Sequence, residues 1–442
     1  MANSMNHTLS RRQFLKHSAV VTTAMAVPWR VFGASASPNA KLVVAIMGCN
    51  SRGMAHIKGM LAAPNVEIAY ICDVDERAVA KGIKAAATKQ GKEPKGAKDI
   101  RKVLEDKSVD AISIATPNHW HAIATIMACA AGKHVYVEKP GSHDPHESEL
   151  MVAAARKYKR VVQMGNQRRS MPGIIEGIHK VRNGAIGRVL TARCWYTRFR
   201  PSIGIGKVAP VPSWLDYDLW QGPAPERPYK DNLIHYNWHW FWHWGNGELG
   251  NNAVHALDVA RWGLGVDAPP RRVTWGGGRY LCKDDQETPD TGVATFDFGD
   301  KLITWEQSSS HDRKAETQAF VSFYGEGGTL SIAGQGYKLY DKKGKEIGGW
   351  KVTGGEGDTV TGPGGEDEHF ANFVSCVRNG GTPNSEIAEG QKSTMLCHYA
   401  NMAVRTAQTI TIDPRNGKVI GNFATMRLWR RDEYRRGWEP KV

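Results

Sequence analysis

The stretch LVVAIMGCNSRGMAHIKGML, residues 42–61, decides the fold. It opens with the apolar run Leu42–Met47, turns at Gly48-Cys49-Asn50-Ser51-Arg52-Gly53 and ends in a helical pattern. This order predicts a buried strand, a glycine turn and a helix. Gly48 permits the tight turn, Gly53 lets the helix approach the strand, and free N–H groups at the helix start suit a pyrophosphate. The stretch therefore predicts a dinucleotide-binding unit.

The next strand, over residues 66–72, ends at Asp73, which stands twenty residues after Gly53. An acid at this place accepts hydrogen bonds from the adenosine ribose and repels the 2′-phosphate of NADP. It favours NAD over NADP, although the nearby Arg77 would suit that phosphate. The turn departs from the G-x-G-x-x-G pattern because Asn50 replaces the middle glycine. Asn is among the residues that best tolerate positive φ.

Strands and helices continue to alternate as far as residue 165. The buried runs are 109–115, 134–137 and 160–164, and helical patterns cover 123–131 and 150–158. Such alternation predicts a doubly wound parallel sheet, which binds ligands at the carboxyl ends of its strands. Polar residues stand at several of those ends. We expect the cofactor to contact Gly48, Asn50, Ser51, Arg52, Gly53, Asp73, Thr116, Pro117, Asn118, His121, Glu138 and Lys139.

Composition narrows the class of protein. The chain has 442 residues, of which 41% are hydrophobic and 23% charged, and this excludes disordered, collagen-like and multi-span membrane proteins. The net charge of +14 could suit a nucleic acid or an anionic membrane surface. Seven Cys residues without a CxxC motif argue against a disulfide scaffold and against a Cys-based zinc site.

The first 36 residues have the features of a twin-arginine export signal. Arg11-Arg12 is followed by Phe14, by a mild apolar run over 18–29 and by an A-x-A cleavage site at 34–36. The segment holds four basic residues and no acid, so its removal lowers the net charge from +14 to +10. The signal implies a periplasmic protein that is exported folded, with its cofactor already inserted, and has no stable membrane association after processing. In an exported protein we expect no nucleic-acid partner.

The motifs of the chain, in this order and spacing over residues 41–265, resemble the Gfo/Idh/MocA family of sugar and cyclitol oxidoreductases. Residues 369–405 also resemble the family's closing helices. The matching groups are Arg52-Gly53 with His56, Cys72-Asp73, Thr116-Pro117-Asn118-His119-Trp120-His121, Glu138-Lys139-Pro140 and Gly250-Asn251-Asn252-Ala253-Val254-His255-Ala256-Leu257-Asp258.

The resemblance implies a Rossmann domain followed by an α+β domain with a large, mainly antiparallel open sheet that carries the substrate, with the nicotinamide between them. It also implies homo-oligomers, because the open sheets commonly pair. Alternating patterns fit strands over 189–199, 293–298, 301–307, 319–324 and 329–332. We expect a signal over 1–36, an NAD-binding domain over 37–165, a substrate domain over 166–410 and a basic and aromatic strap over 411–442. The glycine-rich segment 344–365 is expected to form hairpin turns.

Hydride transfer from a carbinol requires a base that removes the hydroxyl proton. Lys139 matches the family's catalytic lysine, and an ammonium beside oxidised nicotinamide could have a lowered pKa. His255 matches the family histidine that shares the acid–base role, on an expected helix over 249–264. Asn251, one turn earlier on the same face, stands where many members have Asp. Asp258 is expected to orient His255 or to pack structurally.

The densest aromatic run, residues 236–244, suggests a sugar site, because rings stack on the apolar faces of sugars. The alternative is an aromatic loop that packs under the sheet. Arg168 and Arg169 either point into the cleft or pair with acids structurally. The expected substrate contacts are Arg168, Tyr236, Trp238, Trp240, Asn251 and His255. His119, His121, His239 and His243 have ligand-like spacings but no nearby Cys or carboxylate companion, so we expect no metal.

Three functions compete. The first is an NAD(P)-dependent dehydrogenase acting on a secondary hydroxyl of a sugar, glycoside or cyclitol. The second is an NAD-dependent glycosidase that oxidises, eliminates and re-reduces its substrate, with a tightly bound cofactor that is reset at each turnover. The Tyr and His signature of known glycosidases of this kind is not found here in its usual form. The third is a binding protein without activity, suggested by Asn50 and Asn251.

Overall fold

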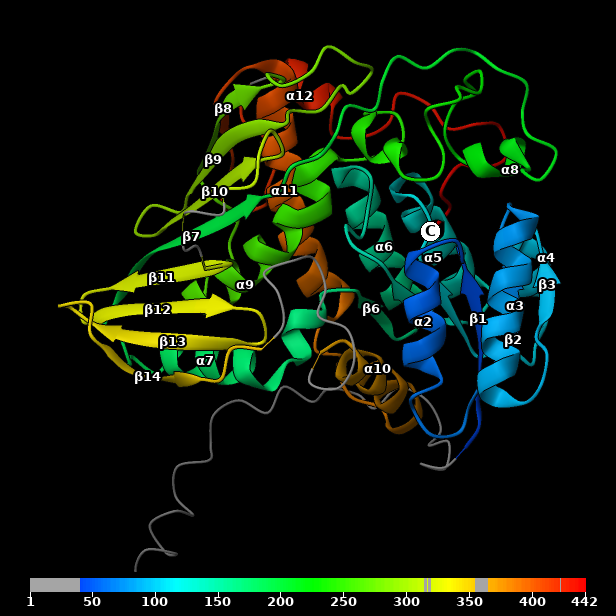
Figure 1. Ribbon diagram of the computed structural model, residues 1–442, viewed down its shortest axis with the longest axis horizontal. Helices are drawn as coiled ribbons and strands as arrows, with labels where there is room; N and C mark the ends of the chain where they lie inside the picture. The colour runs from blue at the N-terminus through cyan, green and yellow to red at the C-terminus, as the bar shows by residue number, and fades with distance from the viewer. Residues whose placement is uncertain (1–39, 314–315, 317–318, 354–364, 422) are drawn as a thin grey trace, which may run out of the picture. The chain divides into compact units, whose positions relative to one another are not determined.

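The first sheet is parallel and is built by residues 42–164. The structure is a computed structural model that describes residues 40–313, 316, 319–353, 365–421 and 423–442, so the predicted export signal lies outside it. The strand order is β3-β2-β1-β4-β5-β6, which confirms the doubly wound sheet (Figure 1). The strands are β1 Leu42–Met47, β2 Val66–Cys72, β3 Lys95–Ala97, β4 Ala111–Ile114, β5 His134–Val137 and β6 Val162–Met164.

Helices cover both faces of this sheet. One apolar cluster joins α2 (Arg52–Met60) and α3 (Glu76–Gln90) to the first face, and another joins α4 (Ile100–Glu105), α5 (Asn118–Ala130) and α6 (Pro145–Lys157) to the second. The first cluster also contains Phe370, Phe373 and Val374 of α10 (Asp367–Asn379). A helix from the far end of the sequence therefore completes the first face, although its residues fall in the range expected for the substrate domain.

The second sheet has nine strands in the order β14-β13-β12-β11-β7-β10-β9-β8-β15. Only β7 and β10 pair in parallel, so the expected large and mainly antiparallel sheet is confirmed. Residues 346–350, expected in hairpin turns, form an edge strand, and 354–364 lie outside the described residues. The strands are β7 Val189–Thr197, β8 Arg272–Gly278, β9 Thr291–Asp297, β10 Leu302–Ser308, β11 Val321–Gly325, β12 Gly328–Ala333, β13 Gly336–Asp341, β14 Glu346–Trp350 and β15 Ile410–Thr411.

This sheet is covered on one face. In β10, Ile303 and Trp305 are buried, whereas the alternating residues Thr304 and Glu306 are half-exposed. The buried face belongs to one apolar cluster with α7 (Pro172–Arg182), α9 (Val254–Leu264) and α11 (Ile387–Thr406). The period of two therefore leaves the other face open to solvent.

The C-terminal tail joins both cores. Trp429 lies in the apolar cluster of the nine-stranded sheet, and Trp438 lies in a cluster of the Rossmann sheet, with its ring 5.0 Å from that of Trp120. Both indoles are buried. The chain after α12 (Phe423–Arg427) thus packs these two aromatic rings against the two layers. No helix in the described part of the chain is long and apolar enough to cross a membrane.

Candidate active site

The glycine turn after β1 lies at one end of a cavity of about 450 Å³. Gly48 has φ +86°, and a Cβ there would lie 2.6 Å from the Ala115 carbonyl oxygen. A Cβ on Gly53 would lie 1.8 Å from the Gly48 carbonyl oxygen. Only glycine fits either position, so the turn is shaped as the dinucleotide motif requires. Asn50 does not need its tolerance of positive φ, because among the described non-glycine residues only Asn65, Lys159 and Ala407 have one.

Asp73 lines the same cavity at the end of β2. Its carboxylate accepts hydrogen bonds from the backbone N–H of Cys49 at 2.6 Å and of Asp75 at 3.0 Å. Burial raises the pKa of Asp73. The two backbone donors hold the carboxylate at the place where the sequence predicts an adenosine ribose.

Arg77 is already engaged near this end. Its Nε and Nη2 donate to the two carboxylate oxygens of Asp75 at 3.0 and 2.9 Å, and its guanidinium lies 3.4 Å from the ring centroid of Trp214. The same carboxylate is 2.8 Å from Nε2 of His235, which also lines the cavity. Trp214 and His235 come from the long segment between β7 and α9, and the sequence predicted no role for either residue.

Glu138 is buried at the lining of the cavity and is surrounded by donors. Its Oε1 accepts from Arg52 Nε at 2.8 Å and Gln167 Nε2 at 3.0 Å, and lies 3.1 Å from His56 Nε2. Burial alone raises the pKa of Glu138, but the Arg52 charge and the His56 hydrogen bond outweigh it and lower the pKa well below its usual range. Arg52 also pairs with Glu366 at 2.6 Å. The Arg52 guanidinium is therefore held by carboxylates, and Glu138 fixes the base of the turn that presents Lys139.

Lys139 reaches across the cavity to the second domain. Its Nζ donates to the backbone carbonyl of Asn251 at 2.7 Å and to Asn251 Oδ1 at 3.2 Å. Asn251 lies in a π-helical turn, η3 (Leu249–Ala253), that leads into α9. The expected α-helix over 249–264 is therefore wrong in its first turn. Both residues line the cavity, so the predicted lysine and the predicted substrate contact meet there.

His255 lies behind Asn251 and is not among the residues that line the cavity. It is buried, and neither ring nitrogen has a hydrogen-bond partner among the residues that the structure describes. Burial lowers its pKa well below 6.5, and the charges of Lys139 and Arg168 lower it further. The folded chain therefore holds His255 neutral, one turn from Asn251.

Two rings of the aromatic run, those of Tyr236 and Trp238, line the cavity together with His239. Trp238 stacks on His239 with ring centroids 3.6 Å apart. Trp240, which was expected to touch substrate, is buried outside the cavity lining. The run therefore divides, and part of it packs in the core as the alternative interpretation expects. Sequence reasoning missed Leu219 and Trp220, at α8 (Tyr217–Gln221), which line the cavity from far along the chain.

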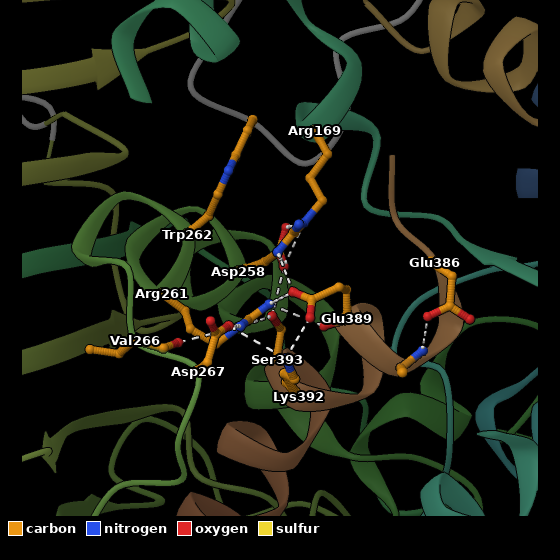
Figure 2. Close-up of polar contacts among 12 residues, drawn as sticks. Arg169, Asp258, Arg261, Trp262, Val266, Asp267, Glu386, Glu389, Lys392 and Ser393 are labelled. Carbon is orange, nitrogen blue, oxygen red and sulfur yellow. Dashed lines mark hydrogen bonds and ion pairs between the residues drawn. The ribbon is translucent and has the colours of Figure 1, made fainter. Parts of the chain in front are cut away.

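The two arginines of η1 (Gln167–Ser170) are buried and bound to protein groups. Arg169 makes a two-pronged contact with Asp258, at 2.8 to 3.0 Å, and Ser393 donates to the same carboxylate at 2.6 Å (Figure 2). Arg168 donates to the Gly334 carbonyl at 2.7 Å and lies over the Phe320 ring. The structural interpretation of Arg169 and Asp258 is thus confirmed, and Arg168 does not line the cavity.

The ring nitrogens of several histidines with ligand-like spacing face backbone carbonyl oxygens. His121 lies 2.7 Å from the Pro140 oxygen and 2.8 Å from the Thr116 oxygen, and His119 lies 2.9 Å from that of Trp220. His239 and His243 lie 2.6 and 2.8 Å from the oxygens of Tyr236 and Pro225. Within the described residues, no group of three or more His, Cys, Asp or Glu could hold a metal ion.

Comparisons with known proteins agree with this geometry. A family model described as the oxidoreductase family, NAD-binding Rossmann fold, matches residues 42–166, and a model of the family's C-terminal alpha/beta domain matches residues 195–275. A model of the twin-arginine translocation signal matches residues 8–28.

Curated relatives match part of the chain. A levoglucosan dehydrogenase of Pseudarthrobacter phenanthrenivorans is 29% identical over 38% of this chain and 36% of its own length. An inositol 2-dehydrogenase of Salmonella typhimurium is 30% identical over 34% and 44%, and an alpha-N-acetylgalactosaminidase of Shewanella oneidensis is 26% identical over 43% and 46%. The chain thus spans less than half the length of these relatives.

Solved structures match most of the chain. A levoglucosan dehydrogenase in complex with NADH and levoglucosan has TM-score 0.65 at 19% identity, over 84% of this chain and 99% of that one. The WlbA dehydrogenase of Bordetella pertussis, in complex with NADH and UDP-GlcNAcA, has TM-score 0.63 at 19% identity, over 85% and 99%. At this identity the likeness concerns the fold.

The glycine turn, the cavity and the nine-stranded sheet define a two-domain protein of the NAD-binding Rossmann oxidoreductase class. Both matched domain models describe one family. The chain matches models of the Gfo/Idh/MocA oxidoreductase family over residues 42–166 and 195–275, and a model of a twin-arginine signal sequence over residues 8–28.

Proposed function

We propose that this protein is an NAD-dependent dehydrogenase that oxidises a secondary hydroxyl of a sugar, glycoside or cyclitol. One observation carries the proposal: a single cavity extends from Asp73 and the glycine turn to Lys139, Asn251 and the ring of Trp238. A cofactor site, a titratable group and an aromatic surface thus share one space, as this chemistry requires. The family and the names of the similar dehydrogenases support it.

The chain's own residues would act as follows. NAD, when held in this cavity, would supply the hydride acceptor. Lys139 Nζ removes the proton of the substrate hydroxyl, and Asn251 Oδ1 orients that hydroxyl or the lysine itself. His255 is neutral and has free ring nitrogens among the described residues, so it can receive or return this proton through Lys139 or a substrate hydroxyl. The rings of Tyr236 and Trp238 hold the apolar face of the substrate.

Two features favour NAD over NADP and favour its retention. The Asp73 carboxylate would repel a 2′-phosphate, and Arg77 is occupied by Asp75 and the Trp214 ring. The segment that carries Trp214 is also fastened to the Rossmann domain. Glu76 N–H donates to the Trp214 carbonyl at 3.1 Å and Asp216 N–H donates to the Val74 carbonyl at 2.9 Å. We therefore propose a cofactor that is held tightly beneath this segment.

A second candidate is the NAD-dependent glycosidase. The chain resembles an alpha-N-acetylgalactosaminidase and glycosyl hydrolase family 109 proteins over more than two fifths of its length, and a retained cofactor suits a cycle that resets itself. In that cycle the sugar hydroxyl would be oxidised to a ketone, loss of a proton from the neighbouring carbon would expel the aglycone, water would add to the resulting double bond, and the ketone would be reduced again by the same cofactor. The net reaction is then hydrolysis.

One assay separates these functions. The purified protein is incubated with NAD and a panel of pyranoses, cyclitols and aryl glycosides, while reduced nicotinamide and the released aglycone are both followed. We expect net reduction without aglycone release. Release without net reduction favours the glycosidase, and neither signal, with ligand binding that survives Lys139→Ala, favours a binding protein without activity.

We also propose that the twin-arginine signal delivers the folded protein to the periplasm and that the protein forms homo-oligomers through the open sheet face. That face exposes Leu190, Val293 and Tyr324. Fractionation of cells that carry the native signal or an Arg11→Lys, Arg12→Lys variant tests the location. Light scattering of the wild type and of a Val293→Lys variant tests the association.

A further inference from the structure

A second cavity, of about 400 Å³, lies outside the site described above. It is lined by the N-terminal end of α6, the end of the aromatic run, α11 and the C-terminal strap, and it shares no lining residue with the first cavity. Trp242 and His243 face it, whereas Tyr236 and Trp238 of the same run face the first cavity. The aromatic run is thus a wall between two separate spaces.

The charges around this second cavity are mixed. Its arginines are Arg227, Arg405, Arg427, Arg430 and Arg431, and its carboxylates are Asp144, Glu226, Glu287, Asp432 and Glu433. A cavity concentrates an anion or a cation when one sign of charge dominates its lining, and here the two signs occur in equal numbers. The lining therefore suits a neutral ligand that can both donate and accept hydrogen bonds.

Several buried polar atoms at this cavity have no hydrogen-bond partner among the described residues. They are the Asn401 side-chain oxygen, Arg431 Nη2 and both ring nitrogens of His143. Asn401 is 6% exposed and the Arg431 side chain 7% exposed. Buried polar atoms without a partner are costly, so they mark a place where a ligand supplies the missing partners. Because these atoms comprise an acceptor, a donor and an imidazole that offers one of each, hydroxyl groups satisfy them best.

An aromatic surface accompanies these polar atoms. The half-buried ring of Trp242 lines the cavity, and the Arg405 guanidinium lies 5.4 Å from its centroid. A ring beside hydroxyl-binding groups is the combination that accepts the apolar face of a sugar. We propose that this second cavity is a binding site for a neutral polyhydroxylated ligand, a sugar ring or a cyclitol, independent of the cofactor site.

The experiment follows ligand binding in each of the two cavities separately. The full-length mature protein is labelled with 5-fluorotryptophan, and the ¹⁹F resonances of Trp242 and Trp238 are assigned with Trp242→Phe and Trp238→Phe. The probes are methyl α-glucopyranoside, myo-inositol and sodium sulfate. We expect at least one of the two neutral probes to shift the Trp242 resonance saturably, both with and without NAD, and we expect sulfate to leave it unchanged.

Two variants locate the effect. Asn401→Leu removes the buried acceptor and Arg405→Ala removes an exposed side chain over the ring, and each should weaken the Kd read at Trp242 about tenfold. Arg193→Ala is the matched control, because Arg193 lies 3.7 Å from the Trp195 ring on the open sheet face. It should leave that Kd unchanged.

Three results would overturn the proposal: no shift of Trp242 with either neutral probe, an equal shift with sulfate, or a Kd that neither variant changes. The test does not depend on catalysis, because Lys139→Ala should keep the Trp242 response. A failure of the proposed dehydrogenase and a failure of this second site are therefore distinguishable.

Discussion

Asp258 and His255 lie three residues apart on α9, and both are buried, yet their surroundings differ. The Asp258 carboxylate accepts hydrogen bonds from Arg169 and Ser393 (Figure 2). Arg261 extends this network, because its Nε donates to Ser393 Oγ and its Nη2 donates to Glu389 Oε2 at 2.8 Å. His255 has no hydrogen-bond partner at either ring nitrogen within the described chain. Since a buried polar atom is usually satisfied, we interpret the Asp258 network as structural support and the ring nitrogens of His255 as groups available for proton transfer.

The largest effect should come from Lys139→Ala. General acid–base groups contribute about 10² to 10⁴ in rate, so kcat should fall by that factor while the melting temperature changes little. Steady-state kinetics and thermal unfolding measure the two. Lys102→Ala, at a side chain that is 74% exposed, is the control and should change neither kcat nor the melting temperature. If Lys139→Ala unfolds the protein instead, the lysine belongs with the supporting groups.

Breaking the hydrogen-bonded network around Asp258 should lower the stability of the fold more than it lowers kcat. Asp258→Ala removes the close partner of the buried Arg169 charge and leaves it the more distant Glu389, at 4.0 Å, so the free energy of unfolding should fall by about 3–5 kcal/mol. Denaturant unfolding measures it. The matched control is Glu326→Ala, which breaks the exposed pair with Arg188 and should change the free energy of unfolding far less, because solvent screens that pair. Equal losses in the two variants would contradict the assignment of Asp258 as a support.

Acid titration sharpens the comparison. Burial lowers the pKa of His369 to about 4, and that of His255 well below 6.5, so both are neutral in the folded chain. The unfolded state binds more protons below pH about 6.5, hence stability is full above that pH and is lost as the pH falls toward the folded pKa. For His369 the loss by pH about 4 is roughly 3 kcal/mol.

The two histidines, His369 and His255, should differ in their effect on catalysis. His369 is satisfied by Ser170 and by the Met164 carbonyl, at 2.7 and 2.9 Å. His369→Gln and His255→Gln should each flatten the slope of stability against pH by about one proton between pH 6.5 and 4. Only His255→Gln should lower kcat, which urea unfolding across pH and steady-state assays would establish. A kcat loss in both variants would remove the distinction between the two histidines.

Much of the fold was predictable, because local patterns govern it. The apolar runs from Leu42 to Met164 predicted every strand of the Rossmann sheet except β3, whose Lys95-Gly96-Ala97 has no apolar run, and the turn residues Gly48 and Gly53 each have a steric reason in the structure. Long-range packing was not predictable: no local pattern indicates that Phe370 of α10 completes the Rossmann core. The π turn at Asn251 also has no period-based signal, because its residues fit an α-helical pattern equally well.

The site was partly predictable for the same reason. Asp73, Lys139 and Asn251 stand in motifs, and the structure brings them to one cavity. Trp220 and His235 also line the cavity, but they belong to none of the motifs, so no local pattern indicated their position. Trp240 and Trp242 share one aromatic pattern, but the fold buries one outside both cavity linings and turns the other toward the second cavity. Composition indicates that aromatic rings gather, and tertiary packing decides which of them a ligand can reach.

The smallest expected effect tests whether Asn251 tunes Lys139. Asn251 Oδ1 lies 3.2 Å from Lys139 Nζ, so Asn251→Asp places a carboxylate beside the ammonium. An opposite charge at this distance favours the charged form and raises the pKa of the lysine by about one unit or more. A base must be neutral to accept a proton, so the rise of kcat/KM with pH should move to higher pH by a similar amount. Asn379→Asp, which makes the same change at an exposed position at the end of α10, is the control, and its profile should keep the wild-type position. An Asn251→Asp profile that does not move would mean that Lys139 is not the group that titrates in the rate, and His255 would then be the base.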